Sequence, residues 1–495
     1  MWFLGIDIGS SSVKLSLFDG EAGKRIASVI YPEEEMEIVS PQSGWAEQDP
    51  ELWWDCVKKG CRKLFTHNYD PASVSGIGIS YQMHGLVLVD KQQRVLRPAI
   101  IWCDSRAIQT GEQAFQTTGV EWCQQHLLNS PGNFTASKLK WVKEHEPVLY
   151  QQIHKMMLPG DFIAMKLSGE ITTTASGLSE GVLWDFRGKQ LANRLLEKME
   201  LDERLIPERV PTLGWQGKVT AEAAESLGIK PGVPIVYRAG DQPNNAFSLN
   251  VLQPGELAAT AGTSGVIYAV TEKPVADPES RVNTFLHVSD TPEAARNGVL
   301  LCVNGTGILY SWLKKNLQGE GQLSYERLNA LAAEVPAGAG GLSCFPFGNG
   351  AERMLNNRIV TARWEGLNFN LHQRGHLARA AQEGIVFALN YGFEVLKELG
   401  VHSQTVRAGQ ANMFLSPVFR NAFVNTTGTV LELYETDGAE GAARAAALGA
   451  GYFKSYTEAF QSLTCLSRYE PGVEAAMYQE LYQSWKERLK EILTQ

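Results

Sequence analysis

Several features that define common classes of protein are missing from this chain of 495 residues. No run approaches the roughly 18 apolar residues that a membrane-spanning helix needs. The net charge is −9 and no Lys/Arg-rich block stands out, which argues against a general nucleic-acid or membrane surface. The sequence begins with an expected strand rather than with a signal-type segment. We therefore expect a cytoplasmic protein that acts on small molecules.

Cysteine pairs and the commonest catalytic motifs are also missing. The seven cysteines form no Cys-x-x-Cys pair, so reduced thiols are favoured over a disulfide or zinc framework. There is no G-x-x-x-x-G-K-[ST] loop and no H-R-D catalytic loop, which excludes a P-loop enzyme and a protein kinase. No His-Glu-x-x-His cluster indicates zinc, and no G-x-S-x-G elbow appears.

Strand-like and helix-like runs alternate along the chain, which predicts an α/β fold with mixed hairpins. The strand-like runs are 74–80, 86–89, 234–238 and 299–303. The helix-like runs are 51–65, 135–145, 378–399 and 440–450. The length by itself favours about two to four domains.

One segment of the first half has a counterpart in the second half. "IDIGSSSV" (Ile6–Val13) resembles "ATAGTSGV" (Ala259–Val266), and each reads as strand, Gly-Ser/Thr-Ser turn, strand. The repeat predicts two halves of similar topology. We place the boundary at the Pro-Gly turn of "LNVLQPGE", which gives an N-terminal domain 1–248 and a C-terminal domain 249–495.

Both turns offer backbone N–H groups and hydroxyls that suit phosphate oxygens, and glycine lets a ligand approach the backbone closely. The candidate phosphate-binding residues are Ser10, Ser11 and Lys14 in the first turn and Gly262 and Thr263 in the second. One such turn is weak evidence, but two copies predict a polyphosphate held from both sides. Lys14 either neutralises phosphate or is a solvated strand lysine.

Asp7 is unusual because aspartate is depleted in strands and a buried unpaired carboxylate is costly. By strand alternation it shares a face with Phe3, Gly5 and Gly9. A Mg²⁺ ion between Asp7 and phosphate oxygens would compensate its charge. The alternative is an aspartate that is hydrogen-bonded to its own turn.

A second carboxylate, Asp241, follows an apolar strand in "VPIVYRAGDQPNNA". It is either the N-cap of the next helix or a general base at the end of a strand. Asn244 and Asn245 either bind a polyol or cap the helix.

Other polar residues follow strand ends of the same half: Met83 and His84 in "ISYQMHGL", and Asp104 and Arg106 in "IIWCDSRA". Open α/β sheets bind ligands at such ends, and several hydroxyl-binding groups together indicate a sugar or polyol. His84 is either structural or sugar-binding, and Asp104 with Arg106 either binds ligand or forms a structural ion pair.

These segments together resemble the FGGY carbohydrate kinases over essentially the whole chain. The matching strings are "GIDIGSSSVK", "GWAEQDPELWW", "QMHGLVLVDKQQRVLRPAIIW", "NFTASKLKWVKEHEP", "LPGDFIAMKLSGE", "AGDQPNNA", "TAGTSGV" and "AGQANMFLSPVF". The resemblance implies two actin-like (RNase H-like) ATPase domains with a nucleotide cleft between them, the first binding sugar and the second nucleotide.

The resemblance also implies the activity and the roles of individual residues. It indicates phosphorylation of D-xylulose at O5 by ATP with Mg²⁺ in a cytoplasmic enzyme, with a homodimer as one expected assembly. Asp241 would be the catalytic base and Asp7 would help to hold the metal. The implied sugar-binding residues are Met83, His84, Asp104, Asp241 and Gln242. The ATP-binding residues would be those of both turns together with Gly307, Gly409, Gln410 and Asn412.

The chain departs from the family pattern at three places. Many relatives have "WND" where it has Trp102-Cys103-Asp104, many have "GGG" where it has Ala408-Gly409-Gln410, and an expected proline is missing from "GAERMLN". The alternatives are a kinase for ribulose, rhamnulose or another keto-sugar, a non-catalytic sensor of the same fold, and an actin-like ATPase of the polymerising or chaperone type.

Overall fold

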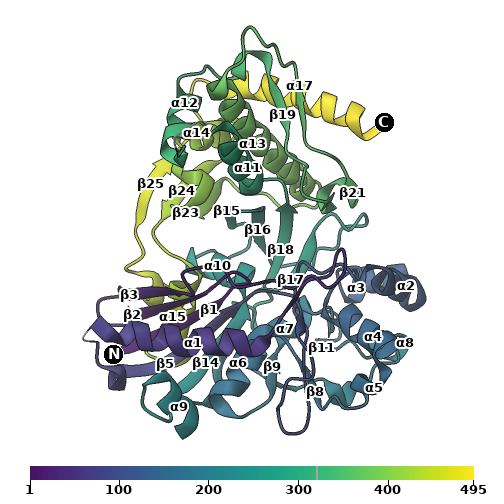
Figure 1. Ribbon diagram of the computed structural model, residues 1–495, viewed down its shortest axis with the longest axis vertical. Coiled ribbons are helices and arrows are strands. Elements are labelled where there is room, and N and C mark those ends of the chain that lie inside the picture. The colour runs from purple at the N-terminus through teal and green to yellow at the C-terminus, as the bar shows by residue number, and fades with distance from the viewer. Residues whose placement is uncertain (68, 319–321, 495) are drawn as a thin grey trace. The chain divides into compact units, whose positions relative to one another are not determined.

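The computed structural model describes residues 1–67, 69–318 and 322–494, which divide into two compact units (Figure 1). Unit 1 comprises 1–250, 284–297 and 436–463, and unit 2 comprises 251–283, 298–435 and 464–495. The sequence predicted a boundary between 248 and 249, and the first long segment of unit 1 ends at Asn250. Two later segments, 284–297 and 436–463, also belong to unit 1, so the units are not two continuous halves of the chain. None of the described helices is long and apolar enough to cross a membrane.

Unit 1 is built on a six-stranded sheet in the order β13-β14-β5-β1-β2-β3. Its strands are β1 (Trp2–Ile8), β2 (Val13–Asp19), β3 (Lys24–Tyr31), β5 (Val74–Tyr81), β13 (Leu213–Lys218) and β14 (Pro234–Gly240). Its main helices are α1 (Pro50–Leu64), α2 (Ile108–Thr118), α4 (Thr135–His145), α6 (Pro159–Ser168), α7 (Ala175–Glu180), α9 (Ala221–Leu227), α10 (Asp241–Ser248) and α15 (Gly438–Gly449).

The two faces of this sheet carry different kinds of side chain. Leu4 and Ile6 of β1 join a large apolar core with Trp53 of α1. The alternate residues face α15, whose alanines allow a very close approach. A Cβ atom on Gly5 would lie 1.8 Å from the carbonyl oxygen of Ala439. Glycine at position 5 therefore lets the helix lie directly on the strand.

Unit 2 is built on a seven-stranded sheet in the order β17-β18-β16-β15-β23-β24-β25. Its strands are β15 (Leu257–Ala261), β16 (Gly265–Thr271), β17 (Asn283–Leu286), β18 (Asn297–Val303), β23 (Thr405–Gly409), β24 (Val430–Tyr434) and β25 (Cys465–Tyr469). Its main helices are α11 (Gly307–Leu317), α12 (Tyr325–Ala333), α13 (Arg374–Glu398), α14 (Pro417–Thr427) and α17 (Ala475–Thr494). The chain passes between the two groups of residues within β17, whose residues 284–286 count with unit 1, and again at the start of β18.

The two sheets confirm the internal repeat. The order β3-β2-β1-β5-β14-β13 corresponds strand for strand to β18-β16-β15-β23-β24-β25. In each sheet an antiparallel hairpin is followed by two parallel strands and a final antiparallel one. The register also aligns Asp7, which pairs with Lys14, with Thr260, which pairs with Val266.

The expected elements agree with the structure to within a few residues. The predicted helices at 51–65, 135–145, 378–399 and 440–450 are α1, α4, α13 and α15. The predicted strands at 74–80, 86–89, 234–238 and 299–303 correspond to β5, β6 (Val87–Val89), β14 and β18. The prediction of an α/β fold with two domains is therefore confirmed.

Candidate functional site

Three parallel strands of unit 1 end level with one another. The register pairs Ile8 of β1 with Tyr81 of β5, and Tyr81 with Gly240 of β14. Gly9, Gln82 and Asp241 therefore follow three adjacent strand ends. Since neighbouring strands lie about 4.8 Å apart, β1 and β14 are about 10 Å apart across β5. The sheet brings Asp7, the Met83–His84 turn and Asp241 to one edge, as the sequence predicted.

Asp241 is the first residue of α10 and not its N-cap, which is Gly240. The N-cap alternative for Asp241 is therefore wrong. Burial and, after it, the charge of Asp7 raise the pKa of Asp241 from 3.8 to about 7, against the opposing hydrogen bonds of Gln242. A carboxyl group that titrates near neutrality is suited to accept a proton at physiological pH.

Asp7 lies opposite the first turn of α15. A Cβ atom on Gly438 would be 2.3 Å from Oδ2 of Asp7, so only glycine leaves room for this carboxylate. Burial and, to a smaller extent, the charge of Asp437 raise the pKa of Asp7 to about 6, against the opposing charge of Lys14. The N-terminal end of a helix also favours negative charge, which helps to accommodate Asp7 at this position.

Lys14 forms an ion pair with Asp437, with 3.0 Å between Nζ and Oδ2. Asp437 is the N-cap of α15 and also pairs with Arg25. Burial alone would raise the pKa of Asp437, but Lys14, the Glu440 amide and Arg25 hold it below its ordinary value. Lys14 is thus held beside Asp7 by a carboxylate partner while its side chain stays partly exposed.

The first turn is supported from outside the hairpin. Gln48 donates a hydrogen bond of 2.6 Å from Nε2 to the carbonyl oxygen of Ser10, and the amide of Met36 donates to the carbonyl oxygen of Ser11. Gly9 donates its amide to the carbonyl oxygen of Ser12 across the turn. These bonds fix the backbone around Ser10 and Ser11, and the hydroxyl of Ser11 is exposed on the outside.

His84 adopts a positive φ of 62°, a conformation that costs energy for any residue except glycine. Two hydrogen bonds hold it there. Its Nδ1 donates to the carbonyl oxygen of Glu180 over 2.9 Å, and its own carbonyl oxygen accepts from Nζ of Lys138 over 2.8 Å. The rings of Phe134 and Phe285 pack against the imidazole. Because a carbonyl oxygen can only accept, the neutral ring carries its proton on Nδ1 and Nε2 is the acceptor.

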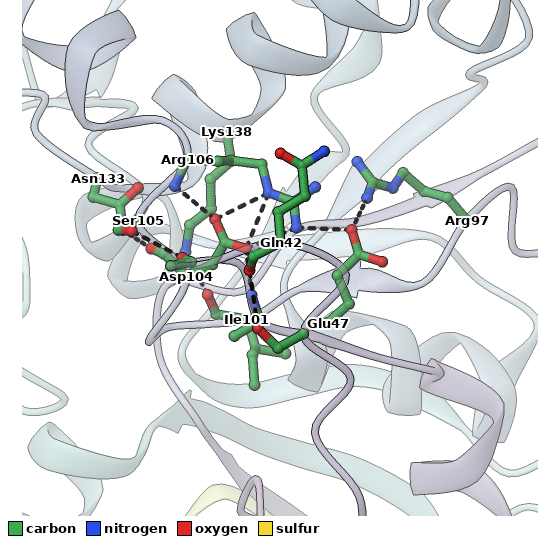
Figure 2. A network of polar contacts seen from close by, with 12 residues as sticks. Gln42, Glu47, Arg97, Ile101, Asp104, Ser105, Arg106, Asn133 and Lys138 are labelled. Carbon is green, nitrogen blue, oxygen red and sulfur yellow. Dashed lines mark hydrogen bonds and ion pairs between the residues drawn. The ribbon is translucent and has the colours of Figure 1, made fainter.

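Asp104 lies in a separate buried network (Figure 2). Its carboxylate is 0% exposed. The carboxylate accepts hydrogen bonds from the amide of Ala46 over 2.6 Å and from the guanidinium of Arg106 over 2.7 Å. The structure therefore does not place the Asp104 carboxylate where a sugar could reach it, and the structural ion pair that the sequence left open is the arrangement observed. Arg106 also pairs with Glu47.

Lys138 connects this network to the His84 turn. It is 0% exposed, and Nζ donates to the carbonyl oxygens of His84 and Ile101. Burial lowers the pKa of Lys138 to about 7, against the attraction of the Asp104 charge. Through Lys138, which is labelled in Figure 2, the network thus holds the backbone of the sugar-site candidate His84.

Unit 2 contains a cavity of about 700 Å³ beside the second turn. Its lining includes the predicted residues Gly262, Thr263, Gly307 and Asn412, and it does not include Gly409 or Gln410. Tyr325, Ala330 and Ala333 of α12 add a mainly apolar wall. A cavity with one polar, glycine-rich end and one apolar end suits a nucleotide, whose base and phosphates differ in the same way.

The second turn packs directly against the first residue of α11. The amide of Gly307 donates to the carbonyl oxygen of Gly262 over 2.9 Å, and a Cβ atom on Gly307 would lie 2.2 Å from that oxygen. Gly409 ends β23, and the amide of Gln410 donates to the carbonyl oxygen of Tyr434. Gly409 and Gln410 thus shape the backbone that leads to Asn412.

A second cavity, of about 780 Å³, lies in unit 1 beside Arg94, Lys166 and Glu222. None of the predicted site residues lines it. Among the described residues, no group of three or more His, Cys, Asp or Glu side chains is arranged to hold a metal ion. Magnesium commonly binds one or two carboxylates together with phosphate oxygens, so the single carboxylate of Asp7 fits that pattern of ligation.

Sequence reasoning missed four residues that shape the site: Lys138, Glu180, Asp437 and Gly438. The "TDG" string before an alanine-rich helix is an N-cap signal for Asp437 and Gly438. A lysine within the buried stretch "TASKLKW" could have identified Lys138. No local pattern distinguishes Glu180.

The sequence matches a known protein family and a curated relative over almost its whole length. The model of the FGGY family of carbohydrate kinases, N-terminal domain, matches residues 2–248, and that of the C-terminal domain matches 257–451. The chain is 30% identical over 501 residues to the xylulose kinase of Escherichia coli strain K12, covering 99% of each chain.

Solved structures agree with the sequence relatives. The xyloylose kinase of Brucella ovis superposes with a TM-score of 0.89 at 26% identity, covering 99% of each chain. The xylulose kinase of Rhodospirillum rubrum superposes with a TM-score of 0.87 at 26% identity, covering 100% of each chain.

Proposed function

The chain belongs to the FGGY family of carbohydrate kinases, and from this premise we propose that it transfers the γ-phosphoryl group of ATP to O5 of D-xylulose, with Asp241 as the general base. The observation that carries this proposal is the convergence of Asp7, the Met83–His84 turn and Asp241 at adjacent strand ends of unit 1. The choice of sugar is supported by the relatives that bear the name xylulose kinase.

The sugar would bind in unit 1 beside Met83, His84, Asp241 and Gln242. Nε2 of the neutral His84 ring is an acceptor for a sugar hydroxyl, because Nδ1 is engaged by Glu180. Oε1 of Gln242 is buried and makes no hydrogen bond within the described residues. A buried acceptor of this kind is costly unless a ligand satisfies it, which favours a polyhydroxylated substrate here.

Asp241 would accept the proton of O5 as the bond between O5 and the γ-phosphorus forms and the bond to the β,γ-bridging oxygen breaks. The pKa of Asp241, raised by burial to about 7, suits this role because the group is ionised at working pH yet basic enough to take the proton. Charge that develops on the phosphoryl oxygens would be stabilised by the amides and hydroxyls of Ser10 and Ser11.

ATP would bind in unit 2, with its base in the apolar part of the cavity and its phosphates at Gly262 and Thr263. Asn412 would contact the nucleoside, and Gly409 and Gln410 would shape the backbone before it. Asp7 would hold Mg²⁺ together with the phosphates, and the ion would supply positive charge that offsets the charge of the triphosphate.

A panel of pentuloses and hexuloses tests this function by the rate of ADP release. We expect D-xylulose to give the highest kcat/KM and a product phosphorylated at O5, identified by NMR. A higher kcat/KM for ribulose, rhamnulose or another ketose would overturn the choice of sugar. Binding of a ketose and ATP without turnover would indicate a sensor in place of a kinase.

A further inference from the structure

Glu180 is a buried acid between the two sides of the proposed sugar site. It is the last residue of α7 and is 2% exposed. Its main-chain carbonyl oxygen accepts the hydrogen bond from Nδ1 of His84 over 2.9 Å. The main chain of Glu180 therefore fixes both the orientation and the tautomer of the His84 ring.

The side chain of Glu180 extends toward the residue before Asp241. A Cβ atom built on Gly240 would lie 2.4 Å from Oε2 of Glu180 and 2.5 Å from Cγ of Met83. The carboxyl group is thus in close contact with the backbone at Gly240 and lies next to Met83. Glycine at position 240 is required by this contact, since any side chain would displace one of the two neighbours.

Burial and two neighbouring carboxylates disfavour a negative charge on Glu180. No lysine, arginine or histidine pairs with its carboxyl group in residues 1–67, 69–318 and 322–494. The charges of Asp241 and Asp161 act against its ionised form, whereas Tyr81 and the His84 backbone favour that form, and Lys138 attracts its charge. Asp161 is itself paired with Arg238, with 3.0 Å between the atoms, so Arg238 is already engaged.

An isolated buried carboxylate is so costly that the group takes up a proton instead. Burial, with the charge of Asp241, raises the pKa of Glu180 well above its ordinary value. The uncharged form of Glu180 is therefore favoured beside Asp241.

We propose that Glu180 is a positioning residue of the sugar site, because its carboxyl group packs against Gly240 and Met83 while its carbonyl oxygen orients His84. In this way one residue sets the position of the base relative to the sugar-binding turn. This inference rests on the proposed function of Asp241 and His84 and names no contact between Glu180 and the substrate.

The test compares Glu180→Ala, Glu180→Gln and the exposed control Glu170→Gln, each checked for folding by thermal unfolding. In Glu180→Ala we expect KM for the ketose to rise about tenfold and kcat to fall about tenfold, with KM for ATP unchanged, because side-chain positioning is lost. Glu180→Gln keeps a neutral group of the same size, so it recovers most of that loss and its kcat/KM falls on the acid side at the same pH as in the wild type.

Glu170→Gln is expected to match the wild type throughout. Two outcomes overturn the proposal. Glu180→Ala could keep wild-type kinetics, or Glu180→Gln could be as impaired as Glu180→Ala with its acid limb moved to lower pH, as a charged Glu180 would require. The second variant keeps the test decisive if Glu180→Ala does not fold.

The assay uses whichever ketose the wild type phosphorylates best. If that sugar is not D-xylulose, the proposed function fails in its choice of substrate, whereas the comparison of the Glu180 variants remains a valid test. Failure of the positioning role is recognised separately, by variants that behave alike on a sugar that the wild type turns over.

Discussion

The predicted phosphate-binding turns of the two units have the same backbone framework. They differ in charge, because only the turn of unit 1 is flanked by charged side chains. In unit 1 the last but one pair of the hairpin is Asp7 with Lys14. In unit 2 the corresponding pair is Thr260 with Val266. Each hairpin is followed in its sheet by two parallel strands. The repeat has therefore kept a backbone that can donate to phosphate in both units and has kept charge in only one of them.

This difference suggests that unit 2 binds the nucleotide and that unit 1 carries the groups that take part in the reaction. The turn of unit 2 borders a cavity with an apolar wall, and neither Gly262 nor Thr263 of that turn carries a charge. The turn of unit 1 lies beside two carboxyl groups whose pKa values are raised by burial to about 6 and about 7. Groups with pKa values near the working pH are typical of sites that move protons or bind metal.

The largest expected effect comes from removing the base on the charged side. Asp241→Asn should lower kcat by about 10³-fold or more, because a general base contributes about 10²–10⁴-fold. KM for ATP should remain unchanged, since the nucleotide cavity lies in unit 2. The measurement is steady-state ADP release with Asp55→Asn, a surface substitution on α1, as the control. A kcat within tenfold of the wild type would show that Asp241 is not the base.

Exchanging the aligned residues Asp7 and Thr260 tests whether the difference in charge sets the roles of the two turns. Asp7→Thr gives unit 1 the residue of unit 2, and we expect kcat/KM for ATP to fall about 10²-fold because charge stabilisation at the phosphates is lost. Thr260→Asp gives unit 2 a carboxylate that repels phosphate, so KM for ATP should rise about tenfold.

The neutral variant Thr260→Val is the control for this exchange and should stay near the wild type. The rates are measured as a function of Mg²⁺ concentration. An unaltered magnesium dependence in Asp7→Thr would contradict its role at the metal, and a wild-type KM in Thr260→Asp would contradict phosphate binding at the second turn.

The glycines at the starts of α15 and α11 allow the turns of unit 1 and unit 2 to be tested separately. The Cβ atom of Gly438→Ala would be 2.3 Å from Oδ2 of Asp7, and that of Gly307→Ala would be 2.2 Å from the carbonyl oxygen of Gly262. We expect the first variant to lower kcat about tenfold and the second to raise KM for ATP about tenfold, because each displaces a different group. Each variant is the control for the other, and the same kinetic defect in both would refute the separation of roles.

How far the sequence predicted the site depends on how local each signal is. Asp7 and Asp241 were identified because each directly adjoins a turn or a strand end, and the parallel register brings such ends together. Asp437 raises the pKa of Asp7 only because α15 packs onto the first sheet. The two residues are more than four hundred positions apart in the sequence, so no local pattern reveals their contact. Asp104 also follows a strand end, but there the choice between ligand and ion pair depends on Arg106, whose position the sequence does not determine.

The smallest effect concerns stability, and it distinguishes the charged side from the neutral one without any substrate. The folded-state pKa of Asp241 is about 7 and its ordinary value is 3.8, so the native protein binds this proton more tightly than the unfolded chain. The free energy of unfolding therefore receives its full contribution from Asp241 below pH 3.8 and loses it as the pH rises through 7.

Asp241→Asn has no such titration, so above pH 7 we expect it to be more stable than the wild type by about 1–3 kcal/mol. Thr260→Val, on the neutral side, should show no pH-dependent difference over the same window. Urea unfolding at a series of pH values measures both. If the free energies of unfolding of Asp241→Asn and the wild type changed in parallel between pH 4 and 7, ionisation of Asp241 would carry no cost in the folded protein. The proposed electrostatic difference between the two units would then be contradicted.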